Sequence, residues 1–110
     1  MINGNLKQFL DTGWWNADAT LFYKEHIYFF DGYFDNENHM HLKISTWKAK
    51  NIDNKSFENI LSSEGDLIDY QCIEIDGQTE EEVRERMLKT KIFENKSFWQ
   101  VEKELIWLDW

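Results

Sequence analysis

The sequence predicts an α+β fold: an antiparallel sheet of about four strands, with three to four helices packed mainly on one face. Three consecutive stretches between residues 19 and 48 are rich in β-branched and aromatic residues, and a later stretch near 67–75 has the same character. Segments with helical spacing of apolar residues lie before and after these stretches. With 110 residues in total, we expect residues 1–110 to form a single globular domain.

The first predicted element is a short helix near the N-terminus. Leu6, Phe9 and Leu10 have the spacing of one helical face. Gly13 is a typical helix end, so the helix is expected to stop near it.

Residues 19–48 predict a three-stranded meander. The stretch Asp35–Asn38 (DNEN) has the composition of a hairpin turn, and Lys24–Glu25 predicts a tighter one. A glycine within a strand often marks a bulge, so Gly32 predicts one in the middle strand.

The third strand of the meander has the clearest pattern. Met40, Leu42 and Ile44 alternate with polar residues, as in a strand buried on one side. The later strand, Leu67–Ile75, carries apolar residues at both parities, which indicates either a bulge or a strand covered on both faces.

The tetrapeptide NKSF occurs twice, at Asn54–Phe57 and Asn95–Phe98. In each copy a serine, Ser56 or Ser97, stands directly before the first apolar residue of a helical pattern, where it can cap the helix. Gln100, three residues after the second serine, completes a capping box. The copies diverge after the phenylalanine, so we interpret them as two independent helix starts.

The most strongly marked helix begins at Thr79 and runs to about Lys89. Thr79 and Glu82 have the spacing of a capping box. Acids in the first turn and a lysine in the last complement the helix dipole.

The C-terminal residues 104–110 fit two structures. We favour a helix that continues to about Leu108, because its apolar spacing extends the preceding face. As a strand, the same segment would place Glu104, Ile106, Leu108 and Trp110 on one side.

Charge and composition narrow the possible functions. The net charge of −9 argues against binding nucleic acid or an anionic membrane surface, because both require basic residues. No apolar stretch is long enough to span a bilayer, and no secretory signal is visible. The lone Cys72 excludes an internal disulfide and fits a cytoplasmic location.

Three histidines form the best candidate for a metal site. His39 and His41 have strand spacing on one face, and His26 could lie on the neighbouring strand, with Asp35 or Glu37 near the turn. A small metal-dependent hydrolase would use such a cluster. The regular alternation around His41 instead indicates a solvated sheet face, so we expect no metal.

No catalytic motif is present. Cys72 lies in an apolar strand pattern, where cysteine usually acts as a small hydrophobic residue. The sequence lacks a nucleophile elbow, a phosphate-binding glycine-rich loop and a pair of cysteines. We therefore expect neither enzymatic activity nor a cofactor.

The acidity is concentrated in one part of the chain. Residues 58–85 contain ten acids and a single base, Arg84. If this segment folds into one negative face, it can steer a basic partner. The candidate residues of that acidic face are Glu64, Asp66, Asp69, Glu74, Asp76, Glu81 and Glu85.

The chain has six tryptophans, more than a small core readily buries. Tryptophan and tyrosine are frequent anchors of protein interfaces. The candidate aromatic anchors are Trp14, Trp15, Trp47 and Trp110. We expect most of the tryptophans to pack the helices onto the sheet, with one or two left for a surface patch.

Together these features favour a small, acidic, non-enzymatic cytoplasmic protein that binds or neutralises a basic macromolecule. Such a profile resembles, in general class only, toxin-neutralising immunity proteins and DNA-mimicking inhibitors. Two other interpretations are a hydrolase that uses His26, His39 and His41, and a ligand-binding domain with a pocket lined by Trp and Tyr.

Overall fold

The computed structural model describes residues 2, 4–14, 19–49 and 67–108. The strands are β1 (Ala19–Tyr23), β2 (His26–Phe34), β3 (Met40–Ala49), β4 (Leu67–Gly77) and β5 (Ile106–Trp107). The helical elements are α1 (Leu6–Gln8), which continues as a π-helical turn (Phe9–Gly13), α3 (Glu80–Lys89), and α4 (Phe98–Val101), which continues as a 3-10 turn (Glu102–Glu104). No helix among these residues is long and apolar enough to cross a membrane.

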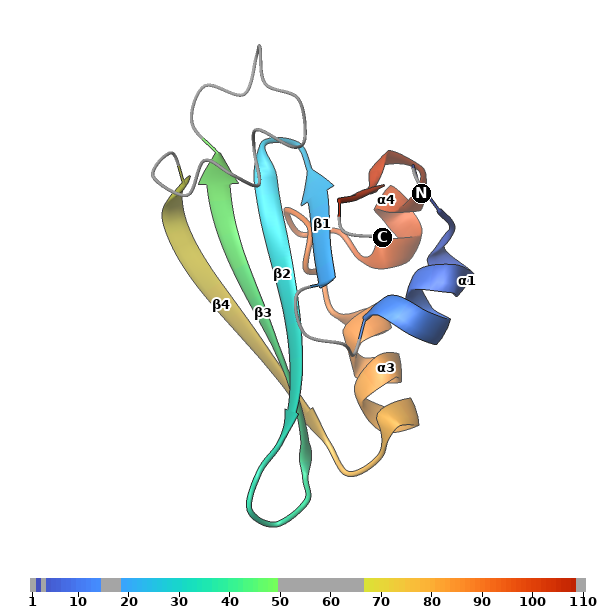
Figure 1. Cartoon of the computed structure of the whole chain (residues 1–110). Helices are drawn as coiled ribbons and strands as arrows, with labels where there is room; N and C mark the ends of the chain where they lie inside the picture. The colour runs from blue at the N-terminus through green and yellow to red at the C-terminus, as the bar shows by residue number, and fades with distance from the viewer. Residues whose placement is uncertain (1, 3, 15–18, 50–66, 109–110) are drawn as a thin grey trace.

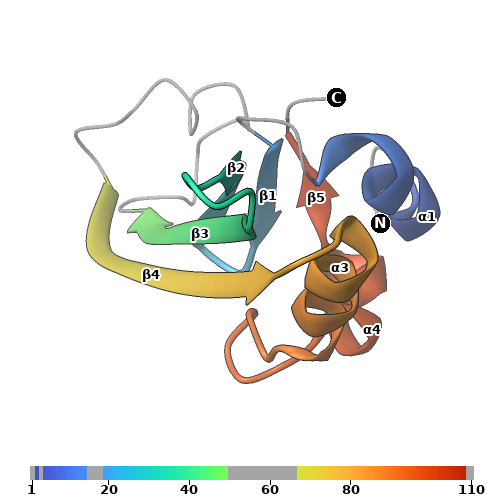
Figure 2. The same ribbon diagram turned by 90° about the horizontal axis from the view of Figure 1, so that it is seen from below.

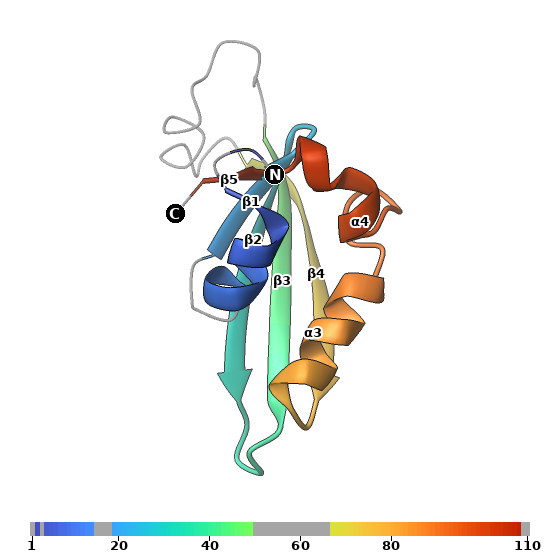
Figure 3. The same ribbon diagram turned by 90° about the vertical axis from the view of Figure 1, so that its right-hand side faces the viewer.

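The strands form one antiparallel sheet in the order β4-β3-β2-β1-β5. The helices lie on one side of this sheet, with α3 beside the end of β4 and α1 toward β5 (Figures 1, 2 and 3). The α+β class is therefore confirmed. The sheet has five strands rather than about four, and the helices are short.

The predicted meander and both of its turns are confirmed. Lys24 and Glu25 both have positive φ angles, as a tight turn between β1 and β2 requires. In the second turn, the Asp35 carboxylate accepts hydrogen bonds from the backbone N–H groups of Glu37 (2.8 Å) and His39 (3.0 Å). Gly32 causes no bulge, because the pairing of β2 with β3 continues unbroken through it, so that prediction was wrong.

The bulge lies in β4 instead. Thr46 pairs with Gln71 and Lys48 with Ile68, so Asp69 and Tyr70 together oppose a single residue of β3. Asp69 has a φ of 54°. The bulge expected in this strand is therefore present, and it brings Ile68 to the same face as Ile73 and Ile75, whereas Tyr70 and Cys72 are exposed on the opposite face.

The helix-covered side of the sheet holds the main core. Phe93, just beyond α3, is the centre of an aromatic group: its ring lies 4.7 Å from that of Tyr28 and 4.9 Å from that of Phe98. Phe9 of the N-terminal helix contacts Phe30 and Trp107 edge to face. These large, fully buried rings fix the helices on this side.

The predicted starts of α3 and α4 agree with the structure. The first helix also has a cap, for which no prediction was made: Asn5 accepts from the Gln8 N–H at 2.7 Å. Thr79 accepts from the Glu82 N–H at 3.2 Å, and Ser97 forms a capping box with Gln100. The other NKSF copy, at Asn54–Phe57, lies outside the described residues.

The C-terminal helix prediction was wrong. The helix ends at Val101 and its 3-10 continuation at Glu104, and then β5 pairs with β1. Alternation in β5 sends Trp107 into the main core and Ile106 against a small cluster on the other face of the sheet. A strand therefore buries apolar residues on two sides at once, which outweighs the helical spacing.

Candidate functional site

The face of the sheet opposite the helices is the strongest candidate for a binding surface. At one end Phe22, Ile27 and Leu108 form a buried cluster. Thr20 is also buried at this end, and the side chains farther along this face are exposed or half-exposed. We call this part the open face; it consists of Asp31 and Tyr33 from β2, His41 and Lys43 from β3, and Tyr70, Cys72, Glu74 and Asp76 from β4.

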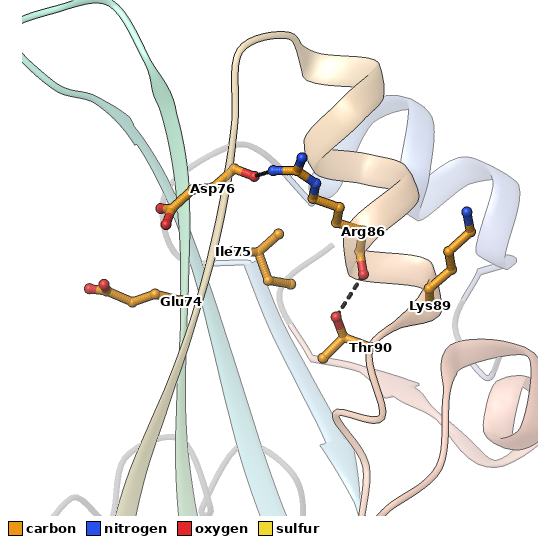
Figure 4. A pocket seen from close by; sticks show the side chains of 6 residues that line it. All are labelled: Glu74, Ile75, Asp76, Arg86, Lys89 and Thr90. Carbon is orange, nitrogen blue, oxygen red and sulfur yellow. Dashed lines mark hydrogen bonds between the residues drawn. The ribbon is translucent and has the colours of Figure 1, made fainter.

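The predicted acidic residues do not form one face. Glu74 and Asp76 belong to the open face, and their side chains point away from α3 (Figure 4). Glu81 and Glu85 are exposed on α3, which packs against the other side of the sheet. Asp69 is exposed at the bulge. The other two candidates, Glu64 and Asp66, lie outside the described residues.

The candidate aromatic anchors do not lie on one surface either. Trp14 is only 1% exposed and belongs to the core, so its side chain has no surface to offer a partner. Trp47 is half-buried beside the open face, with its ring 5.2 Å from that of Phe29 and 4.9 Å from that of Tyr70. Trp15 and Trp110 lie outside the described residues.

The three histidines do not form one cluster. His26 pairs with Lys48 at one end of β3, whereas His41 lies seven residues away along the same strand, a distance of ~23 Å. His39 precedes β3 rather than lying in it. In the described part of the chain, no group of three or more His, Cys, Asp or Glu side chains is arranged to hold a metal ion.

His41 joins the hairpin turn to β4. Its Nε2 lies 2.8 Å from a carboxylate oxygen of Asp35, and its Nδ1 hydrogen-bonds the Asp76 carboxylate. The Tyr33 ring stacks on the imidazole, with 5.1 Å between centroids. Asp35 and then Asp76 raise the pKa of His41, and hydrogen bonding to His41 lowers the pKa of Asp35 to about 2.

This geometry limits the chemistry that His41 can perform. Both ring nitrogens are engaged by carboxylates, so neither is left to accept a proton from a substrate or to bind a metal. The raised pKa favours the imidazolium, which donates from both nitrogens. His41 therefore acts as an ionic link between Asp35 and Asp76.

Lys43 is the basic residue at the centre of the open face. In the strand register, Lys43 lies opposite Asp31 of β2 and opposite Glu74 of β4. Charge interactions with the side chains of Tyr70 and Cys72 are the main causes that raise the pKa of Lys43 above its ordinary value of 10.5. A lysine is charged at neutral pH even at that ordinary value. The open face thus combines three acids (Asp31, Glu74 and Asp76), two cations (Lys43 and the His41 imidazolium) and the rings of Tyr33 and Tyr70.

A hollow of about 440 Å³ lies between β4 and the C-terminal half of α3. Arg86 crosses the space between them and donates to the backbone carbonyl of Asp76 (Figure 4). The lining residues are Glu74, Ile75, Asp76, Arg86, Lys89 and Thr90.

A second hollow, of about 330 Å³, shares Asp76 and Arg86 with the first and extends to His39 and His41.

Sequence reasoning missed Arg86. Its position four residues after Glu82, to which it forms an ion pair at 2.6 Å, was a signal that could have drawn attention to it.

A third hollow, of about 330 Å³, lies on the helix-covered side between the sheet and residues 91–95. Among the described residues that line it, Tyr28 is the one Tyr or Trp and most of the others are polar. The lining residues are His26, Tyr28, Thr46, Gln71, Ile73, Lys91, Ile92, Glu94 and Asn95. This is not the Trp- and Tyr-lined pocket that the ligand-binding interpretation requires.

Comparison of the chain with protein-family models, with curated proteins and with solved structures gave no match. The function must therefore be argued from the residues and geometry of this chain.

Proposed function

We propose that this protein binds a basic protein partner through the open face and catalyses no reaction. The observation that carries the proposal is the meeting of acids and aromatic rings on one exposed surface. Glu74 and Asp76 stand on the same face as Tyr33 and Tyr70, which are 40% and 51% exposed. Trp47 borders this group.

The two kinds of side chain have complementary roles in such an interface. Carboxylates steer a positively charged partner and speed its association. Tyrosine and tryptophan supply large contact areas with little loss of conformational freedom, and they are frequent hot spots of interfaces. The acids on α3 lie on the other side of the sheet and serve solubility in this proposal.

Neutralisation of a basic partner is the form of binding that suits this chain best. A small chain with a net charge of −9 can present carboxylates to a surface that otherwise binds a polyanion, as immunity proteins and DNA-mimicking inhibitors do. The exposed thiol of Cys72 suits a reducing compartment, which supports a cytoplasmic location.

The experiment compares charge reversals on the two surfaces. Glu74→Lys changes the open face, whereas Glu81→Lys makes the same change at an exposed position of α3. Each variant and the wild-type protein would be used to capture partners from the source organism, followed by identification and by association kinetics at two salt concentrations. We expect Glu74→Lys to reduce the association rate and Glu81→Lys to leave it nearly unchanged.

Salt provides the second readout, because exposed charges are screened beyond ~8–10 Å at physiological ionic strength. Wild-type association should slow as salt rises. Equal capture by both variants, together with salt-independent association, would show that the open face does not recognise a basic partner.

A further inference from the structure

β4 forms an edge of the described sheet, and the hairpin shows which way its backbone groups point. The Asp35 N–H donates to the His39 carbonyl at the base of the turn. In an antiparallel ladder hydrogen-bonded pairs alternate, so the next hydrogen-bonded pair of the hairpin is Tyr33 with His41. The backbone groups of His41 therefore point toward β2, and those of its β4 partner, Asp76, point away from β3.

The same alternation directs the N–H and C=O groups of Glu74 and Cys72 to the outer edge of the sheet. Arg86 confirms the direction at Asp76, because its guanidinium donates to the Asp76 carbonyl from the side of α3. Among the described residues, none outside the sheet hydrogen-bonds the backbone of Glu74 or Cys72. This edge therefore offers two residues with donors and acceptors in the spacing that an added strand requires.

The space beside this edge can receive a chain. The 440 Å³ hollow runs between β4 and α3, with Ile75 on the sheet side and Arg86, Lys89 and Thr90 on the helix side (Figure 4). The bulge at Asp69 interrupts regular pairing farther along β4. The usable edge is therefore short.

We propose that an extended segment of the partner adds to β4 as a further antiparallel or parallel strand, with lysine or arginine at every second position. This inference rests on the proposed binding of a basic protein and specifies how it docks. Side chains of an added strand alternate between its two faces. Those on the open face lie beside Glu74 and Asp76, which favour a basic residue.

The other side chains of the added strand enter the hollow, where Arg86 and Lys89 disfavour a positive charge. Those positions therefore require uncharged residues. A second copy of this chain fits poorly, because its own β4 would bring Glu74 and Asp76 of two acidic chains together. The recognised pattern is thus a strand with alternating basic and uncharged residues.

The test uses a fluorescein-labelled octapeptide of alternating lysine and threonine, with fluorescence anisotropy as the readout. The control peptide has the same composition, with its four lysines followed by its four threonines. We expect the alternating peptide to bind about tenfold more tightly, a difference of about 1.4 kcal/mol. Equal affinities would overturn the proposal, because net charge alone would then explain binding.

Backbone methylation of the peptide tests the added strand without any change to the protein. One alternating peptide carries N-methyl groups on its lysines and another on its threonines. Only every second N–H of an added strand faces its neighbour, so one methylated peptide should lose binding and the other retain it. An equal effect of the two methylations would contradict strand addition.

A pair of protein variants supplies the matched test. Glu74→Pro removes an N–H that points to the outer edge, where proline is tolerated, while Glu74→Gln removes only the charge. We expect the proline variant to bind the alternating peptide about three- to tenfold more weakly than the glutamine variant, which corresponds to one lost hydrogen bond. Equal binding by two folded variants would contradict the proposal, and the methylated peptides decide the question if the proline variant unfolds.

The outcomes separate this inference from the function on which it rests. The alternating and control peptides could bind equally, and the two methylations could have equal effects, while Glu74→Lys still slows capture of the natural partner relative to Glu81→Lys. In that case strand addition is wrong and the open face remains the binding surface. If the peptide results and the charge reversals both fail, both proposals are wrong.

Discussion

The two faces of the sheet come from the same strands but have opposite properties. Along β3, Leu42 and Ile44 are 0% exposed on the helix-covered face, whereas the intervening His41 and Lys43 belong to the open face. Because side chains alternate along a strand, a single stretch of sequence supplies both a core and an exposed surface. The comparison teaches that each face should respond to a different kind of mutation.

The covered face depends on the packing of large rings, and truncation there removes apolar burial and leaves a cavity. The open face depends on exposed charges and half-buried rings, whose individual contributions to stability are small. Substitutions on the covered face should therefore change the free energy of unfolding. Substitutions on the open face should change partner binding and the pH dependence.

The largest expected effect is on the covered face. Phe93→Ala removes a ring that contacts Tyr28 and Phe98 and should lower the free energy of unfolding by about 3–5 kcal/mol. Tyr70→Ala on the open face removes a ring that is 51% exposed and should cost much less. Urea unfolding of both variants measures the difference. Equal losses would show that the two faces do not differ in what they contribute to stability.

The next largest effect concerns the contact between Gly77, at the end of β4, and Val83 of α3. A Cβ atom added at Gly77 would lie 2.8 Å from a Val83 methyl and 3.3 Å from the Val83 backbone N. Gly77→Ala should therefore push α3 from the sheet and cost about 1–3 kcal/mol. The same substitution in a Val83→Ala background should cost less, because the clashing methyl is gone. A loss of the same size in both backgrounds would show that the clash is not the cause.

The N-cap of α3 should contribute less to the free energy of unfolding than the Phe93 ring or the close contact at Gly77. Thr79→Ala removes the acceptor for the Glu82 N–H and should cost about 1 kcal/mol. Thr79→Ser keeps a hydroxyl and serves as the control. The melting midpoint in a reversible unfolding experiment measures the effect, and an unchanged midpoint in the alanine variant would contradict the role of Thr79 as a cap.

Local signals in the sequence predicted local structure well. The Thr79 cap, the turns at Lys24–Glu25 and Asp35–Asn38, and the alternation in β3 depend on neighbours within a few residues, and all are confirmed. The fifth strand was missed because its apolar spacing fits a helix equally well. Only pairing with β1, which lies far away in the sequence, selects the strand.

The candidate site was predicted only in part for the same reason. The acids of residues 58–85 lie in one segment of the sequence. After Gly77, however, the chain leaves β4, whose Glu74 and Asp76 belong to the open face, and forms α3 on the other side of the sheet. Charge counting cannot detect that division. The link between Asp35, His41 and Asp76 was also invisible, because it joins a turn to a strand 35 residues beyond His41.

The smallest expected effect on stability is a pH dependence that arises from this link. The pKa of His41 is raised above its ordinary value of 6.5, so its contribution is complete below that value and is lost as the pH rises through the folded-state pKa. The pKa of Asp35 is lowered from 3.8 to about 2, so its contribution is present above 3.8 and is lost as the pH falls toward 2.

Both contributions coexist between about pH 4 and pH 6.5. His41→Gln should remove the first contribution and reduce the second, since hydrogen bonding to His41 is the main cause that lowers the pKa of Asp35, while the backbone N–H groups of His39 and Glu37 still donate to this carboxylate. The wild-type protein should therefore exceed this variant in stability most near pH 5, and less near pH 3 and pH 9. His39→Gln is the matched control, because His39 lies 3.6 Å from the same carboxylate without bridging to Asp76. Urea unfolding at the three pH values measures the difference. If the wild-type and His41→Gln stabilities differ by the same amount at every pH, the ionic link does not stabilise the open face.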